Sequence, residues 1–234
     1  MNNSNILSSL IYQRDKLFKE LTRESLSEQC NTMYLQIKSG EAMVFSDKDE
    51  MLQNLDRLRK NTSFDKQYFD TINLYNELNE AELILNYEDE FLRVFNDSIF
   101  LDRVNEMQAL FIEYSDDYYY YTSCIECYGM QQYPIVIEPR YISNEYDYNK
   151  YILMIEKGIN FEKSSPSVDD IFYTYGEYLN INILQLFQLN TRILLFKALN
   201  NLDNNGRLSF IKNSPFMFYI NQHDTEVMSL YVKL

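Results

Sequence analysis

The sequence is poor in the residues that most catalytic and metal sites need. Among 234 residues it has no tryptophan, one histidine, three cysteines, five glycines and four prolines. Few glycines and prolines disfavour a turn-rich sandwich and leave no glycine-rich phosphate loop. A single histidine, His223, excludes a multi-histidine metal centre, and a Ser-His-Asp triad would depend wholly on it. An odd number of cysteines indicates reduced thiols and a cytoplasmic location.

The chain also lacks a secretory signal and a membrane-spanning stretch. No basic region or long apolar run follows Met1. The most apolar window, residues 181–199, carries several polar and charged side chains, namely Asn182, Gln185, Gln188, Asn190, Arg192 and Lys197. Charges near a bilayer centre are costly, so this window predicts a buried helix of a soluble protein, with no membrane partner.

Positive charge is scarce. The chain has 35 acidic and 21 basic residues, a formal net charge of −14. This balance argues against nucleic acid as a partner. It permits a basic protein as a partner, because opposite charges speed association. The alternative is that the negative charge only keeps the protein soluble.

The rest of the chain is expected to pack around one long apolar segment, residues 167–206. Ser167 is placed to cap a helix, with Asp170 three residues on. Apolar residues then recur at spacings of three and four as far as Phe196, and Asn204 to Gly206 supply a stop signal. The pattern predicts a long central helix in which Leu186 and Phe187 are buried.

The first half of the chain is predicted to be mainly helical. Helices are expected over residues 6–26, from Ser46 to about residue 61, and over 64–100 with a break near Asn86 and Tyr87. Residues 31–45 are predicted to be extended, because Met33, Leu35 and Ile37 alternate with polar residues before a turn at 39–41.

The second half mixes both kinds of element. We expect a helix from Asn105 through Phe111, strands over 118–125 and 133–138, and a helix over 145–158. After the central helix, strands are expected over 208–211 and 216–220 and a closing helix over 227–234.

These elements predict an α+β, helix-rich fold with a small, mostly antiparallel sheet around the long C-terminal helix. Residues 1–234 are expected to form one globular unit. Its best subdivision is a mainly helical part, 1–105, and an α+β part, 106–234, and residues 61–63 are a second candidate boundary.

The pair Cys124 and Cys127 forms a C-x-x-C motif on a predicted strand. A zinc site would need two more ligands, and only Cys30 and His223 remain. Residues three apart on a strand point to opposite faces. We therefore expect buried structural thiols, no metal, no cofactor and no assigned catalytic residue.

Two groups of residues are candidates for binding a partner protein. An acidic helix face is predicted from Glu77, Glu80, Glu82, Glu88, Asp89 and Glu90, with a solvated surface as the alternative. A tyrosine run, Tyr118, Tyr119, Tyr120 and Tyr121, offers interface anchors, with half-buried strand residues as the alternative.

The segment from Phe196 to Arg207, followed by residues 216–220 and by Gln222, His223 and Asp224, carries a resemblance. It is similar to the C-terminal part of the SMI1/KNR4-like immunity proteins found beside bacterial polymorphic toxins. The similarity covers residues 106–234 at most. The Phe-Gly pair usual after the helix-ending glycine is absent, and the family's tryptophans have no counterpart.

The resemblance implies a non-enzymatic, cytoplasmic immunity protein that binds and neutralises a toxin, and it transfers no catalytic residue. Two alternatives stay open. One is an interaction or adaptor protein of a phage or mobile element. The other is a hydrolase or transferase that uses carboxylates and His223. Oligomeric state is not indicated by the sequence.

Overall fold

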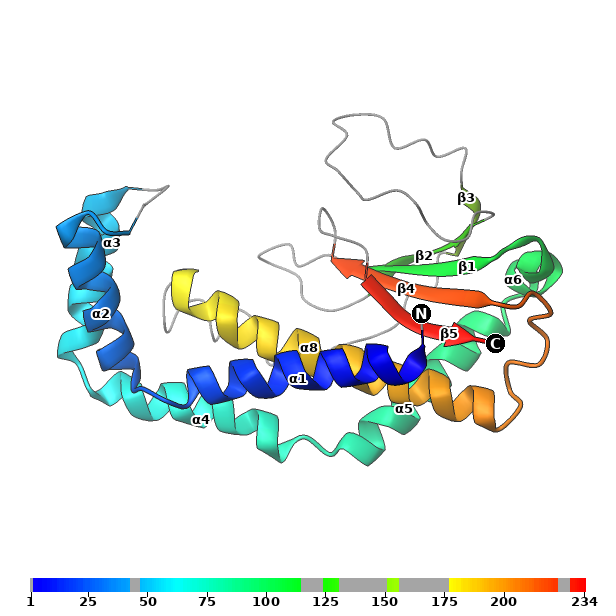
Figure 1. Cartoon of the computed structure of the whole chain (residues 1–234), viewed down its shortest axis with the longest axis horizontal. Coiled ribbons are helices and arrows are strands. Elements are labelled where there is room, and N and C mark those ends of the chain that lie inside the picture. Colours follow the sequence, from blue (N-terminus) through cyan, green and yellow to red (C-terminus); the bar gives the residue numbers. More distant parts are fainter. Residues whose placement is uncertain (1, 43–46, 115–123, 131–150, 156–176, 223–227) are drawn as a thin grey trace. The chain divides into compact units, whose positions relative to one another are not determined.

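The computed structural model describes residues 2–42, 47–114, 124–130, 151–155, 177–222 and 228–234 (Figure 1). The chain divides into two compact units that interleave along the sequence. Unit 1 comprises residues 1–12, 79–165 and 188–234, and unit 2 comprises residues 13–78 and 166–187. The sequence had suggested one globular unit, with a possible subdivision near residue 105 or at residues 61–63.

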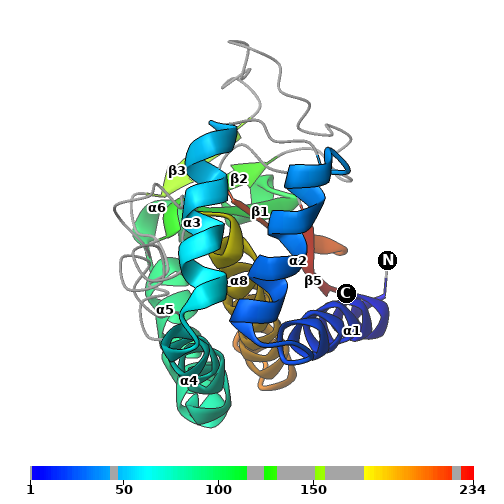
Figure 2. The same cartoon turned by 90° about the vertical axis from the view of Figure 1, so that its left-hand side faces the viewer.

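The described part of unit 2 is built from helices. It contains the later part of α1 (Asn3–Leu21), α2 (Leu26–Ser39), α3 (Lys48–Lys60), α4 (Ser63–Glu77) and the first part of α8 (Glu177–Asn204). Helices α2 and α3 lie side by side as a hairpin (Figures 1 and 2). Asp47 caps α3 by accepting hydrogen bonds from the N–H groups of Asp49 and Glu50. The predicted second helix is thereby confirmed.

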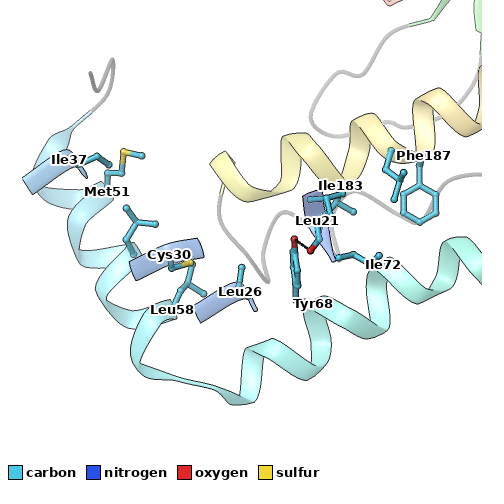
Figure 3. Packing of buried hydrophobic residues seen from close by; sticks show 12 residues of the cluster. Leu21, Leu26, Cys30, Ile37, Met51, Leu58, Tyr68, Ile72, Ile183 and Phe187 are labelled. Carbon is cyan, nitrogen blue, oxygen red and sulfur yellow. Dashed lines mark hydrogen bonds between the residues drawn. The ribbon is translucent and has the colours of Figure 1, made fainter. Parts of the chain in front are cut away.

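The core of unit 2 is one cluster contributed by all five helices (Figure 3). Leu186 and Phe187 are 0% and 1% exposed, which confirms their predicted burial. Ile183, one turn earlier on α8, belongs to the same cluster. The other members are Leu21, Leu26, Cys30, Ile37, Met51, Leu55, Leu58, Tyr68 and Ile72.

The prediction of an extended segment over 31–45 is wrong for its described part, because residues 26–39 form helix α2. Ser25 and Glu28 close a capping box at the helix start. Leu26, Cys30 and Ile37 share the buried side at helical spacing, so the alternation of Met33, Leu35 and Ile37 was coincidental. Gly40 ends the helix with a φ of 82°, a left-handed conformation that favours glycine.

The break within the long acidic helical region was also misplaced. It falls at Leu78 and Asn79, between α4 and α5 (Glu80–Phe95), and not at Asn86 and Tyr87. Asn79 starts α5 because its side chain accepts a hydrogen bond from the N–H of Glu82. Tyr87 is 2% exposed in the middle of α5. A short helix, α6 (Ser98–Arg103), and a 3-10 turn (Val104–Glu106) follow.

The described residues of unit 1 include a five-stranded sheet with the order β3-β2-β1-β4-β5. The strands are β1 (Ala109–Tyr114), β2 (Cys124–Met130), β3 (Tyr151–Ile155), β4 (Phe216–Gln222) and β5 (Met228–Lys233). The central pair β1 and β4 is parallel, and the other three pairings are antiparallel. The α+β class with a mostly antiparallel sheet is therefore confirmed, although the sheet is mixed.

Helix α5 and the part of α8 in unit 1 lie on one face of this sheet (Figure 1). They contact it through aromatic side chains. Phe95 of α5 lies 6.1 Å from Phe218 of β4, measured between ring centroids. Phe196 of α8 lies 5.4 Å from Tyr231 of β5. These contacts tie both helices to the two C-terminal strands.

Helix α8 ends as predicted. The N–H of Gly206 donates to the carbonyl of Asp203, and the N–H of Arg207 donates to the carbonyl of Leu202. This is the Schellman pattern, and Gly206 adopts the positive φ of 71° that it requires. The predicted start of the helix at Ser167 lies outside the described residues.

Several predictions in the second half are wrong. Residues 109–111 belong to strand β1 rather than to the end of a helix, and residues 228–233 form a strand rather than a helix. Residues 151–155 form a strand inside the predicted helix 145–158, and residues 208–211 form turn and irregular structure rather than a strand. Ala109 to Ile112 and Leu230 to Val232 are buried throughout, so these strands show no alternation that would mark them. Turn hydrogen bonds such as Ile211 N–H to the carbonyl of Leu208 occupy the backbone at 208–211. The strand at 216–220 is confirmed as part of β4.

Candidate protein-binding surface

Helix α5 has one buried stripe and one exposed stripe. Leu83, Tyr87, Phe91, Val94 and Phe95 recur at helical spacing and are buried. This stripe includes Phe95, which contacts the sheet. The opposite stripe is the one that a partner protein can reach.

The six acidic residues predicted as one helix face are divided between two helices. Glu77 is the last residue of α4 and belongs to unit 2, whereas the other five lie on α5 in unit 1. Glu80 accepts a 2.6 Å hydrogen bond from Lys197 Nζ of α8. Glu88 accepts a 2.8 Å hydrogen bond from Asn201 Nδ2, also of α8. These two carboxylates therefore hold α5 to α8 within unit 1.

Glu90 also has an intramolecular partner, since it forms a 2.6 Å ion pair with Arg93 one turn later on α5. Helix pairs of this kind contribute little stability when exposed, but they neutralise local charge. Of the predicted acidic residues on α5, Glu82 and Asp89 are exposed, and Glu80, Glu88 and Glu90 are half-buried. Within the described residues neither Glu82 nor Asp89 forms an ion pair.

Leu85 lies between these two carboxylates on the same side of α5. The spacings of three and four residues place Glu82, Leu85 and Asp89 on one stripe, and Leu85 is 61% exposed. We call these three residues the outer stripe. Sequence reasoning missed Leu85, because an apolar residue in an amphipathic helix was assigned to the core. Leu83, Tyr87 and Phe91 follow one another at a spacing of four residues, and Leu85 does not fit that spacing. This departure from the buried pattern could have shown that Leu85 is exposed.

The other predicted binding group, Tyr118 to Tyr121, lies outside the described residues. So does His223. Cys124 and Cys127 both belong to strand β2. Within the described part of the chain no group of His, Cys, Asp and Glu side chains is placed to hold a metal ion.

A polar cluster that the sequence did not reveal joins α2 to α3. The guanidinium of Arg59 lies 3.8 Å from the ring centroid of Tyr34, and its Nη1 donates to Asn31 Oδ1 at 2.9 Å. Arg59 also donates through Nε and Nη2 to Asp56. Hydrogen bonds from Lys60 and Arg59 lower the pKa of Asp56 below its ordinary value. Because each charge has a partner, the cluster fixes the hairpin and offers little unpaired charge to a ligand.

Two buried titratable groups have raised pKa values. Burial, reinforced by the charge of Asp65, raises the pKa of Cys30 to about 12. Burial, together with the 2.8 Å hydrogen bond that its hydroxyl donates to Asp203, raises the pKa of Tyr231. Both groups stay protonated near neutral pH, so neither is suited to act as a nucleophile there.

None of the helices in the described part of the chain is long and apolar enough to cross a membrane. Comparisons with protein-family models, with curated proteins and with solved structures found no match to this chain.

Proposed function

We propose that this chain is a non-enzymatic protein-binding protein, and that it acts as an immunity-type inhibitor of a basic toxin domain in the cytoplasm. The observation that carries the proposal is the outer stripe of α5. There, the exposed side chain of Leu85 lies between two exposed carboxylates, Glu82 and Asp89.

The outer stripe combines two features that interfaces use. Its carboxylates attract a basic surface at long range and mainly raise the association rate. Its leucine supplies an apolar contact that water-exposed charge cannot supply, and apolar contacts at the centre of an interface mainly slow dissociation. A net charge of −14 adds to the long-range attraction.

The sequence adds two supports. The resemblance of residues 106–234 to immunity-type proteins implies a toxin as the partner. The tyrosine run at 118–121 remains a predicted source of further anchors. The adaptor and enzyme alternatives remain hypotheses, and replacing His223 by Ala would abolish activity only if the enzyme alternative held.

The proposal is tested with the product of the gene adjacent to the one for this chain. We expect that product to slow bacterial growth when expressed alone, and this chain to restore growth and to form a complex with it. A neighbour that is harmless, or that is toxic but neither bound nor neutralised, would contradict the proposal.

Binding kinetics then locate the surface. The variant E82K/D89K should slow association roughly 10-fold at low salt and less at higher salt, with little change in dissociation. Leu85→Ala should speed dissociation instead. The matched control is D70K/E77K, which changes the net charge equally at two exposed positions of α4 with the same spacing of seven. Equal slowing by both charge variants would show that net charge acts, and not the outer stripe.

A further inference from the structure

Within unit 1, helix α8 and strand β5 are joined by a contact between a cation and a sulfur atom. Arg192 of α8 donates a hydrogen bond from Nη1 to Sδ of Met228 at 2.8 Å. Met228 is the first residue of β5 and pairs with Ile220 of β4. Both side chains of the contact are half-buried, so water and small solutes reach part of each.

A thioether is an uncommon partner for a guanidinium group. Its sulfur is a weak acceptor, whereas arginine forms its strong, charge-assisted hydrogen bonds with oxygen. The separation of 2.8 Å between Arg192 Nη1 and Met228 Sδ is an ordinary length for a hydrogen bond from nitrogen to oxygen, and it is close for the larger sulfur. The position in front of Arg192 therefore suits an oxygen better than the sulfur that lies there.

Oxidation of the thioether to a sulfoxide supplies such an oxygen. We propose that hydrogen peroxide oxidises Met228, and that Arg192 then binds the sulfoxide oxygen. A lone pair of the sulfur attacks one oxygen of the peroxide, so that an S–O bond forms as the O–O bond breaks. The sulfur is oxidised by two electrons and the peroxide is reduced, while the transferred oxygen gives its proton to the departing hydroxide, which leaves as water. Methionine has three rotatable bonds, so the sulfur can withdraw while its oxygen turns toward Nη1.

The other methionines whose side chains the structure describes lie in apolar surroundings. Met107 and Met217 are 0% and 2% exposed, and Met51 belongs to the core cluster of unit 2. Met33 is half-buried like Met228, but it packs against that cluster. A sulfoxide at these positions places a polar oxygen among apolar side chains, which is costly. At Met228 the same oxygen meets a cation, so oxidation there strengthens the contact between α8 and β5.

Glutamine tests the contact without an oxidant, because its side chain carries an oxygen on the atom that corresponds to the sulfur. Met228→Gln should raise the melting temperature by about 2–4 °C, the shift expected for one added hydrogen bond in a chain of this size. In the background of Arg192→Leu, which removes the donor, the same substitution should lower the melting temperature. Met33→Gln is the matched control and should lower it equally in both backgrounds. An equal shift on Met228→Gln with and without Arg192 would overturn the proposal.

Hydrogen peroxide tests the modification itself on the native chain. Peptide mass spectrometry after treatment with limiting peroxide assigns each sulfoxide, and Met228 should be oxidised at least roughly 10-fold faster than Met107 and Met217, because susceptibility follows exposure. The fraction oxidised at Met228 alone is then separated by hydrophobic-interaction chromatography. It should melt about 2–4 °C above the reduced chain. This measurement needs no substitution, so it decides the question even if Arg192→Leu does not fold.

Two results of the peroxide experiment would contradict the proposal. The first is a Met228 that remains a thioether while Met107 or Met217 is oxidised, since Met228 would then not be a site of oxidation in the folded chain. The second is a chain oxidised at Met228 that melts at or below the temperature of the reduced chain, since Arg192 would then not bind the sulfoxide oxygen.

Discussion

The two units build their cores from different side chains. The twelve-residue cluster of unit 2 contains only two aromatic residues, Tyr68 and Phe187, and is otherwise aliphatic or sulfur-containing. In unit 1 a continuous set of ring contacts links the helices to the sheet, and it passes through Phe91, Phe95, Phe100, Phe210, Phe218, Tyr231 and Phe196. Unit 1 also buries many aliphatic side chains, such as Leu110, Ile193 and Leu199, so its linked rings add to an aliphatic core and do not replace it.

Phe95 shows the difference most clearly. Its ring lies within 6.1 Å, between centroids, of four other rings, those of Phe91, Phe100, Phe210 and Phe218. Two of these partners belong to the last 25 residues of the chain. A single side chain therefore joins α5 to segments that are far away in the sequence.

The largest effect is expected from Phe95→Ala. Loss of a ring that is 1% exposed should reduce the free energy of unfolding by about 3–5 kcal/mol, because the cavity adds to the lost transfer energy. Guanidinium unfolding measures the loss, and hydrogen exchange locates it. Phe64→Ala, a partly buried ring of unit 2, is the control and should cost less. Equal losses for both would contradict the dependence of unit 1 on this ring.

Leu186→Ala and Phe187→Ala test the aliphatic core. Each should cost about 2–5 kcal/mol, since both side chains lie in the cluster of unit 2 with almost no exposure. Hydrogen exchange should accelerate first in α2, α3 and α4. The measurement is the melting temperature of each variant against that of Leu85→Ala, which truncates an exposed leucine. Unchanged melting temperatures for both core variants would refute a central role for this part of α8.

A smaller effect is expected at the start of α2. Asp65 of α4 accepts hydrogen bonds from the backbone N–H of Ser27 at 2.8 Å and from its hydroxyl at 2.9 Å. Asp65→Ala should cost roughly 1 kcal/mol, as the loss of a helix cap does. It should also lower the pKa of Cys30, because the charge of Asp65 helps to raise it. Urea unfolding and the pH dependence of thiol labelling at Cys30 check both effects, with Asp70→Ala on the same helix as the control.

The smallest effect concerns acid stability. The backbone N–H and the hydroxyl of Ser25 lower the pKa of Glu28 from its ordinary value of 4.5. The folded chain thus releases this proton more readily than the unfolded chain does. The ionised Glu28 carboxylate therefore stabilises the folded chain above pH 4.5, and this contribution is lost as the pH falls through the pKa of Glu28 in the folded chain. Glu28→Gln should flatten the fall in melting temperature below that pH, and Glu41→Gln should not.

Helices with clear caps and periodicity could be predicted from the sequence. The helix start predicted at Ser46 lies one residue before Asp47, which caps α3, and the stop predicted at residues 204–206 matches Gly206 at the end of α8. Each signal lies within a few residues of the boundary that it sets. For α2 the apolar pattern is ambiguous, since Met33, Leu35 and Ile37 fit a strand while Leu26, Cys30 and Ile37 fit a helix. The contact that supports its first turn comes from Asp65, 38 residues away from Ser27.

Strand β5 and the outer stripe escaped prediction for related reasons. Residues 224–226 look like a helix start, and only pairing with β4 makes the following segment a strand. For the acidic residues, no local pattern indicates that Lys197 and Asn201 contact Glu80 and Glu88 from more than 100 positions away. Tertiary contacts, and not the local sequence, therefore decide which carboxylates are left to bind a partner.

The central strand pair has a consequence for how the protein is made. Ala109 of β1 is in register with Met217 of β4, so 108 residues separate two neighbours in the middle of the sheet. At roughly 5–20 residues per second, a ribosome needs about 5–20 s to make the intervening chain. Throughout that interval one side of β1, with the apolar run from Ala109 to Ile112, has no strand to pair with. The nascent chain is therefore exposed to intermolecular strand pairing for seconds, and completing β4 ends that exposure.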